Sequence, residues 1–243
     1  MEGLGNTFIV VLGPLLPTEQ EIINLCQSYG EKPADGLLVA TPINSSAVRM
    51  QYWNTDGSPA EMCGNGLRCL AKFARAKELV DKSSFVVETD AGQLKVRCDD
   101  SDEELVEAQV GKVAVSDQAI NIYGAKFFTA NVGNPHAVTF VDDLESAPVT
   151  TLGPKVEVDS RFPNKTNVEF VQGIDQNNIS LRTWERGVGE TLACGTGMTA
   201  ASAVFVEYNH GEYPLTVEVR GGKSKLWVDK DGFTRMLGPA KFS

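Results

Sequence analysis

Two cysteines in this 243-residue chain end the same local pattern, and each stands where a helix is expected to begin. The first pattern runs from Trp53 to Cys63, and the second runs from Trp184 to Cys194. In both, tryptophan precedes cysteine by ten positions and Gly-x-Gly follows it; the cysteines are 131 positions apart (194 − 63). The N-terminus of a helix carries unpaired N–H groups and the positive end of the dipole, which favour a thiolate. The spacing therefore predicts two thiols suited to proton transfer.

A thiolate and a thiol on opposite faces of one carbon can invert its configuration, because one takes a proton while the other returns one. The glycines that follow each cysteine, Gly64 and Gly195, let the backbone approach a ligand closely. Helix N–H groups can hold the carboxylate of that ligand and stabilise the charge that develops when Cα loses its proton. These residues predict an amino-acid racemase or epimerase that uses neither a cofactor nor a metal.

Other landmarks repeat at nearly the same offset. Asn6 and Asn134, each after a glycine, are 128 positions apart (134 − 6), and Gly36 and Asn167 are 131 apart (167 − 36). Landmarks in the same order at nearly constant spacing indicate an internal duplication. A doubled fold places its equivalent residues across a pseudo-twofold axis, so we expect the two cysteines to face each other across one cleft at a domain interface.

Strands dominate the expected secondary structure. Alternating or β-branched runs predict strands over residues 47–53, 84–89, 93–98, 107–113, 126–129, 137–141, 168–172, 179–184, 215–219 and 225–228. Helical spacing of apolar residues predicts helices over 18–29, 66–79 and 197–208. We therefore expect an α+β fold of two pseudo-symmetric, β-barrel-like halves, each wrapped around a central helix. Residues 1–114 would form the half with Cys63, completed by residues 234–243, and residues 115–233 the half with Cys194, with the joint near 113–118.

Polar residues beside these motifs are candidates for binding the substrate. Glu185 and Arg186 precede the glycine-rich approach to the second cysteine and can bind an ammonium and a carboxylate. His136, one of two histidines, lies at a repeat landmark and could tune a cysteine through a hydrogen bond. Four asparagines lie at repeat landmarks and are expected to line the cleft: Asn6, Asn54, Asn134 and Asn167.

Composition narrows the classes of partner. A net charge of −10 argues against nucleic acid and anionic membrane as partners. Five cysteines without a CxxC pair indicate a reduced, cytoplasmic chain, and we expect no targeting segment and no membrane span. Two histidines and scattered cysteines give no zinc-ligand spacing, and no lysine is marked as a pyridoxal partner.

Two further readings stay open on these residues. A papain-like hydrolase would pair one cysteine with His136 as its base, and this leaves the second cysteine unexplained. A non-catalytic amino-acid-binding protein of the same fold would not need both thiols, so the presence of both argues against it.

The motifs together resemble the diaminopimelate epimerase family over essentially the whole chain. The similarity rests on Gly3-Leu4-Gly5-Asn6, Asn54-x-Asp56-Gly57-Ser58, Cys63-Gly64-Asn65-Gly66-x-Arg68-Cys69, Gly133-Asn134-Pro135-His136, Thr166-Asn167-Val168, Trp184-Glu185-Arg186-Gly187, Ala193-Cys194-Gly195-Thr196-Gly197 and Gly238-Pro239-Ala240. The chain departs from the family pattern at Glu2, where histidine is common, at Gly36, where some members carry glutamine, and over residues 27–34.

The resemblance implies a cofactor-free epimerase that interconverts LL- and meso-diaminopimelate in lysine and peptidoglycan biosynthesis, working in the cytoplasm as a homodimer. It implies that Cys63 and Cys194 are the acid/base pair, and that Glu185 and His136 tune the thiols. The substrate-binding residues it implies are Asn6, Asn54, Asn134, Asn167, Glu185 and Arg186, with the backbone of Gly64, Asn65, Gly195 and Thr196 at the reacting carboxylate. The main alternative is a racemase of another amino acid, such as histidine, on the same fold.

Overall fold

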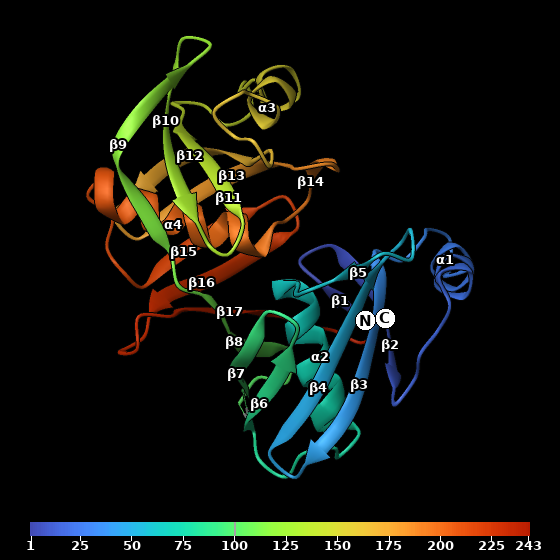
Figure 1. Ribbon diagram of the computed structural model, residues 1–243. Coiled ribbons are helices and arrows are strands. Elements are labelled where there is room, and N and C mark those ends of the chain that lie inside the picture. Colours follow the sequence, from blue (N-terminus) through green and yellow to red (C-terminus); the bar gives the residue numbers. More distant parts are fainter. Residues whose placement is uncertain (100) are drawn as a thin grey trace. The chain divides into compact units, whose positions relative to one another are not determined.

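β-strands are more extensive than helices in both halves of the chain, and the chain divides into two units (Figure 1). The computed structural model describes residues 1–99 and 101–243. The first unit comprises Met1–Gln109 and Leu237–Ser243, and the second comprises Val110–Met236. The end of the chain therefore belongs to the unit that contains its beginning. Within the described residues, no helix is long and apolar enough to cross a membrane.

The first unit is a run of strands around one long helix. Strand β2 pairs in parallel with β3, β3 antiparallel with β4, β4 in parallel with β6, and β6 antiparallel with β7, which pairs with β8. One face of these strands packs its apolar side chains on α2 in a hydrophobic core, and the opposite face of β2 and β3 packs on α1 in a second core. Its elements are β1 (Glu2–Gly3), β2 (Asn6–Leu12), α1 (Glu19–Gln27), β3 (Gly36–Asn44), β4 (Ala47–Asn54), β5 (Pro59–Ala60), α2 (Gly64–Ala76), β6 (Ser84–Thr89), β7 (Gly92–Cys98) and β8 (Leu105–Gly111), which runs on into the second unit.

The second unit repeats this arrangement. Strand β11 pairs in parallel with β12, β12 antiparallel with β13, β13 in parallel with β15, and β15 antiparallel with β16. Its elements are β9 (Ala114–Ile122), β10 (Ala125–Asn131), β11 (Pro135–Phe140), α3 (Val149–Glu157), β12 (Asn167–Asp175), β13 (Asn178–Glu185), β14 (Gly189–Thr191), α4 (Gly195–Tyr208), β15 (Leu215–Val219), β16 (Gly222–Val228) and β17 (Thr234–Pro239), whose last residues belong to the first unit.

The pairing register shows the duplication residue by residue. Phe8 of β2 pairs with Gly36 of β3, and His136 of β11 pairs with Asn167 of β12. Gly36 and Asn167 therefore occupy equivalent places, as their spacing predicts. The α+β fold of two similar halves, each built around a central helix, is confirmed.

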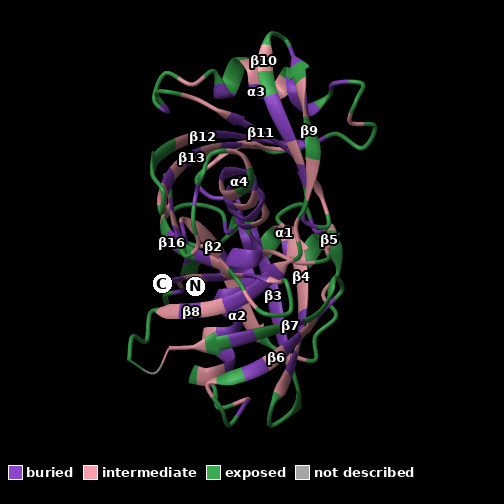
Figure 2. Ribbon diagram, turned by 90° about the vertical axis from the view of Figure 1, so that its left-hand side faces the viewer, coloured by how far each residue is buried: buried purple, intermediate pink, exposed green. Residues whose placement is uncertain are grey.

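The central helix of each unit is buried by the strands around it. Figure 2 shows α4 nearly end-on, inside the arc of β12 and β13. In α4, Met198, Ala201, Val204 and Phe205 are buried, so small and large apolar residues cover most of its surface. Such a helix is stable only in a core, because it has no polar face to turn to water. Its position fixes where the residue that precedes it must lie.

The sequence analysis predicted neither helix α3 nor strands β1, β2, β3, β5, β9, β14 and β17, and two of these omissions, β9 and α3, have a clear local cause. Strand β9 begins at Ala114, within the segment predicted as a joint, and its largely exposed polar residues hide the strand pattern. Helix α3 contains Gly153 and Pro154, and both residues normally argue against a helix. Gly153 lies against the ring of Trp184: a Cβ there would come within 2.8 Å of Trp184 Cγ. The missing side chain thus allows α3 to pack on β13.

Candidate active site

Cys63 is the N-cap residue of α2. Its backbone is extended (φ −139°, ψ 124°), and its Sγ accepts a hydrogen bond from Gly66 N at 3.5 Å. An N-cap residue normally offers an oxygen to these amides, so here the thiol takes the place of a serine or aspartate side chain. The fold therefore directs the first-turn N–H groups of α2 at a sulfur atom, as the motif predicts.

Asn65 and Asn6 meet beside this cysteine. Asn65 Nδ2 donates to Asn6 Oδ1 at 2.6 Å, which links the start of α2 to the start of β2. The guanidinium of Arg68, which is fully buried, donates to Asn65 Oδ1 at 2.7 Å and to Gly64 O at 3.3 Å. Arg68 was not predicted as a site residue, although a charged residue among apolar helix positions was the signal. It holds the residues that follow Cys63 in place.

Asn54 lies at the end of β4 and closes a turn. Its Nδ2 donates to Ser58 Oγ at 3.1 Å, and its carbonyl oxygen accepts from Gly57 N at 3.0 Å. Gly57 has φ +81°, a conformation that glycine adopts without strain. The Asn54 side chain is therefore already engaged within its own turn in the ligand-free protein.

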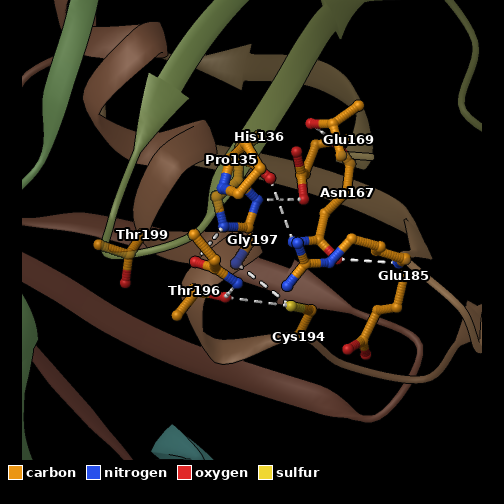
Figure 3. Close-up of polar contacts among 12 residues, drawn as sticks. Pro135, His136, Asn167, Glu169, Glu185, Cys194, Thr196, Gly197 and Thr199 are labelled. Atoms are coloured by element: carbon orange, nitrogen blue, oxygen red, sulfur yellow. Dashed lines mark hydrogen bonds and ion pairs between the residues drawn. The ribbon is translucent and has the colours of Figure 1, made fainter. Parts of the chain in front are cut away.

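Cys194 is the N-cap residue of α4 and repeats the geometry of Cys63. Its Sγ accepts a hydrogen bond from Gly197 N at 3.3 Å and lies 3.5 Å from Thr196 Oγ1 (Figure 3). The side chain of Cys194 is buried. Thr199, one turn further along α4, donates its hydroxyl to Gly195 O at 2.9 Å. A second thiol therefore lies at the N-terminus of a central helix.

Burial and charge work against the thiolate at Cys194. Burial raises the pKa of the Cys194 thiol well above its ordinary value, and the nearby carboxyl groups of Glu185 and Glu169 raise it further. Hydrogen bonds from Thr196 and from Gly197 N act in the opposite direction on this pKa. The hydrogen bonds at the helix terminus thus favour the thiolate, as expected, but burial and the two carboxyl groups outweigh them and raise the pKa of Cys194.

Glu185 lies beside Cys194 at the end of β13. Burial raises the pKa of the Glu185 carboxyl, and hydrogen bonds from Thr191 and Cys194 oppose that rise. The Thr191 hydroxyl donates to Glu185 Oε1 at 2.5 Å. Glu185 therefore contacts the thiol that the sequence predicts it to tune.

His136 does not reach Cys194 directly but is joined to it through other side chains. One ring nitrogen, Nδ1, lies 2.8 Å from Glu169 Oε1, and the other, Nε2, lies 3.0 Å from Asn134 Oδ1. Asn134 Nδ2 donates to Thr196 Oγ1 at 3.3 Å. Glu169 was missed by the sequence analysis, although an acidic residue inside the apolar run of β12 was a visible signal.

Asn167 ties the loop after β13 to β11. Its Oδ1 accepts from Arg186 N at 2.9 Å, and its Nδ2 donates to Pro135 O at 3.2 Å. The Arg186 guanidinium donates to Asn164 O at 2.8 Å. Arg186 and Asn134 also line a polar cavity of about 710 Å³, together with Asn131, Gly133, Pro135, Arg161, Phe162, Pro163, Asn164 and Lys165.

Each unit therefore gathers its own share of the predicted residues. The first contains Cys63, Gly64 and Asn65 at the start of α2, Asn6 at the start of β2 and Asn54 at the end of β4. The second contains the remaining predicted residues around the start of α4: Cys194, Gly195, Thr196, Asn134, His136, Asn167, Glu185 and Arg186. Among residues 1–99 and 101–243, no group of three or more His, Cys, Asp or Glu side chains is placed to hold a metal ion.

Comparison with known proteins gives consistent matches along the chain. The family model for diaminopimelate epimerase matches residues 1–115 and 128–243. A diaminopimelate epimerase of Bacillus licheniformis is 38% identical over 267 aligned residues, which cover 99% of this chain and 94% of that protein. A diaminopimelate epimerase of Methanococcus maripaludis is 36% identical and covers 99% of this chain and 95% of its own length.

Solved structures with the same fold are more distant in sequence. A PhzF-family phenazine biosynthesis protein of Bacillus anthracis superposes with a TM-score of 0.72 at 17% identity, covering 99% of this chain and 93% of its own. A probable proline racemase of Agrobacterium radiobacter superposes with a TM-score of 0.72 at 14% identity, covering 98% and 88%. These likenesses establish the fold alone.

Proposed function

Because the chain belongs to the diaminopimelate epimerase family, we propose that it interconverts LL- and meso-2,6-diaminopimelate, a step of lysine and peptidoglycan precursor biosynthesis. The observation that supports this most strongly is identity of 38% across nearly the whole chain, combined with two cysteines that each cap a central helix. The reaction is an isomerisation: one carbon loses a proton and regains one on its opposite face.

The proposed chemistry uses one cysteine in each protonation state. A thiolate removes the Cα proton and becomes a thiol, while the other cysteine, a thiol, gives its proton to the opposite face of the same carbon and becomes a thiolate. For the reverse reaction the roles of Cys63 and Cys194 exchange. The mechanism requires that both sulfur atoms reach one substrate carbon, and exclusion of water from the bound substrate would protect the carbanion.

Helix termini would stabilise the charge that forms between the two steps. As Cα loses its proton, negative charge moves onto the adjacent carboxylate, where N–H groups in the first turns of α2 and α4 are suitable donors. Gly64, Asn65, Gly195 and Thr196 occupy those first turns. We propose that Asn6, Asn54, Asn134, Asn167, Glu185 and Arg186 bind the polar groups of the substrate.

Proton exchange in D2O tests this proposal. The reduced protein would be incubated with LL-diaminopimelate and, separately, with L-histidine, and deuterium at Cα and product chirality would be followed. We expect inversion of diaminopimelate alone, abolished in Cys63→Ala and Cys194→Ala and retained in Cys98→Ala, which removes a partly buried cysteine outside the motifs. Inversion of histidine would support the two-cysteine chemistry but show that the substrate is a different amino acid. No exchange with either amino acid would favour a non-catalytic binding protein.

The same family membership leads us to infer a homodimer in the cytoplasm. Light scattering coupled to size-exclusion chromatography would give the mass directly, for comparison with the 26.2 kDa chain. A monomer at micromolar concentration would contradict the inferred dimer without affecting the proposed chemistry.

A further inference from the structure

The two units differ in the buried residues on the strands that pack beside each cysteine. In the register of the parallel strands, Phe8 of β2 stands where His136 stands in β11, and Leu38 of β3 stands where Glu169 stands in β12. Phe8 and Leu38 are buried apolar residues of the first core. The second unit thus replaces a hydrophobic pair with a histidine and a carboxyl group, both without exposed surface.

Burying a polar pair costs free energy, because both groups lose their contact with water. Hydrogen bonds to other buried groups must offset that cost. Glu169 Oε1 is bound to His136, while Glu169 Oε2 is buried without a hydrogen-bond partner within residues 1–99 and 101–243. Glu169 Oε1 also lies close to the start of α4, 2.8 Å from the position of a Cβ at Gly197. At Gly66, the equivalent position, the nearest atoms are the methyl groups of Leu38 at 3.3 Å, followed by Cys63 Cβ at 3.5 Å. The fold itself therefore does not require a carboxyl group here.

The hydrogen bonds from this pair run in one direction toward Cys194. Asn134 Oδ1 can only accept, so His136 Nε2 carries a hydrogen and donates it. In a neutral ring beside an ionised Glu169, the ring's only hydrogen would lie between Nδ1 and Oε1, and Nε2 would have none. Nε2 keeps its hydrogen because the pair holds one further proton, either on Glu169, which then donates to Nδ1, or on the ring, which then donates to Glu169 Oε1 as an imidazolium. The amide of Asn134 then presents Nδ2 to Thr196 Oγ1, which accepts from it at 3.3 Å. The Thr196 hydroxyl hydrogen is left to donate to Cys194 Sγ, 3.5 Å away.

Reversing the hydrogen bond between His136 and Asn134 would turn the Thr196 hydroxyl hydrogen away from Cys194. If His136 Nε2 lacked its hydrogen, the Asn134 amide would turn over and present Oδ1 to Thr196. The Thr196 hydroxyl would then donate to Asn134 and would no longer stabilise a thiolate at Cys194. We propose that Glu169 is a positioning residue for Cys194, which fixes the hydrogen on His136 Nε2 and so keeps the Thr196 hydroxyl directed at the sulfur. This inference rests on the proposed role of Cys194 in proton transfer.

The state of the imidazole can be read without any assay of activity. The chain has two histidines, so protein labelled with ¹⁵N-histidine gives two sets of ring signals, and a His210→Asn variant assigns them. Asparagine suits position 210, whose φ is +56°. We expect a hydrogen on Nε2 of His136 throughout the pH range in which the wild-type protein is active. A neutral ring with its only hydrogen on Nδ1 would overturn the proposal, whatever the substrate proves to be.

A double-mutant cycle tests the connection to the sulfur. We expect Glu169→Leu, which introduces the residue found at the equivalent position 38, and Thr196→Val each to lower kcat about 10- to 100-fold, the loss of one hydrogen bond to a charged group. If Glu169 acts through Thr196, the double variant should be within about threefold of Thr196→Val alone. The proposal would be overturned if the kcat of the double variant fell by the product of the two single losses. It would also be overturned if either single variant kept nearly the wild-type kcat.

Two controls separate this result from loss of folding and from loss of the enzyme's chemistry. Glu218→Gln removes a carboxylate from an exposed ion pair with Lys223 and should leave kcat unchanged. Thr196→Ser keeps the hydroxyl and should restore most of the turnover lost in Thr196→Val. Should Glu169→Leu fail to fold, the ring signals of the wild-type protein still decide the question. If the proposed function itself is wrong, the wild-type protein will not exchange the Cα proton of diaminopimelate.

Discussion

Arg68 is a charged side chain with no exposed surface in the first unit. Its donors are satisfied by Asn65 Oδ1 at 2.7 Å, Gly64 O at 3.3 Å and Pro239 O at 3.5 Å. A buried cation is tolerated only when such partners replace its lost hydration. Two of the three partners immediately follow Cys63, so this guanidinium connects the closing segment of the chain to the start of α2.

Arg68→Met should destabilise the protein by about 3 kcal/mol, because it leaves buried acceptors without donors. Chemical denaturation monitored by far-UV circular dichroism measures this free energy of unfolding. Arg97→Met is the matched control: Arg97 is half exposed and paired with Glu107, and its loss should cost below about 1 kcal/mol. Equal losses in the two variants would refute the role assigned to the buried guanidinium.

The carboxyl group of Glu185 lies beside the Cys194 thiol and affects its pKa. After burial, Glu185 is the largest influence that raises the pKa of the Cys194 thiol. Removal of its negative charge should lower this pKa and move thiolate formation to lower pH. The sign is opposite to that expected if Glu185 acted as a base that assists ionisation of the thiol.

Glu185→Gln should therefore alkylate faster with iodoacetamide at Cys194, several-fold at pH 8, with the whole pH profile moved to lower pH. Mass spectrometry of the peptide that contains Cys194 measures the rate. Glu190→Gln is the control, since Glu190 lies in the neighbouring strand β14 and is paired with Arg182 and Arg220. Slower alkylation in Glu185→Gln would exclude the electrostatic role.

At the scale of elements, α3 is held on β13 through one residue without a side chain. Gly153 lies against the Trp184 ring, and the ring Nε1 donates to Glu157 Oε2, at the end of the same helix, at 2.8 Å. Glu157 Oε1 accepts from Gly187 N at 3.0 Å, in the turn that follows β13. Helix α3 thus supports the segment that contains Glu185 and Arg186, although it provides none of the predicted site residues.

Gly153→Ala should destabilise the protein by about 1–3 kcal/mol, because the new methyl group overpacks the Trp184 ring. The same change should raise KM, since it displaces the turn that follows β13. Thermal unfolding and steady-state kinetics measure the two effects. Thr150→Ala, an exposed position of α3, should change stability by less than about 0.5 kcal/mol. A stable Gly153→Ala variant with unchanged KM would show that α3 does not support this turn.

At the scale of the whole molecule, the duplication is conserved in backbone pairing and altered in its interior. The pairing of β2, β3, β4 and β6 is repeated by β11, β12, β13 and β15, with a cysteine capping the central helix in each unit. The proposed chemistry needs two cysteines, one as a thiolate and the other as a thiol. Different surroundings for equivalent residues provide such a difference.

Mild oxidation should inactivate the protein, because two thiols that serve one carbon can form a disulfide. Dithiothreitol should restore activity, and mass spectrometry should find peptides with Cys63 linked to Cys194. Cys98→Ser removes another partly buried thiol and should be inactivated to the same extent as the wild-type protein. Inactivation that a reductant cannot reverse would contradict this prediction.

The sequence by itself determined the duplication, the cysteines at the starts of the two central helices and most of the strands. These are local properties: residue spacing reports strand and helix periodicity, and cysteine followed by glycines reports a cap. Strand β9 and helix α3 were missed for the same reason, since exposed polar residues and a Gly-Pro pair weaken the local signal. The predicted site residues came from the repeat landmarks and from the resemblance to the diaminopimelate epimerase family, both of which are read from the sequence alone.

The chemical environment of each cysteine, and with it the pKa of its thiol, was decided only by the tertiary structure. Burial of Cys194 beside Glu185 and Glu169 raises the pKa of its thiol, and residues far apart in the sequence produce that environment. Glu169 and Arg68 gained their roles in the same way, because a charge becomes informative when the fold removes it from water and assigns its partners. Spacing can place a residue at the start of a helix, but desolvation depends on everything that packs around it.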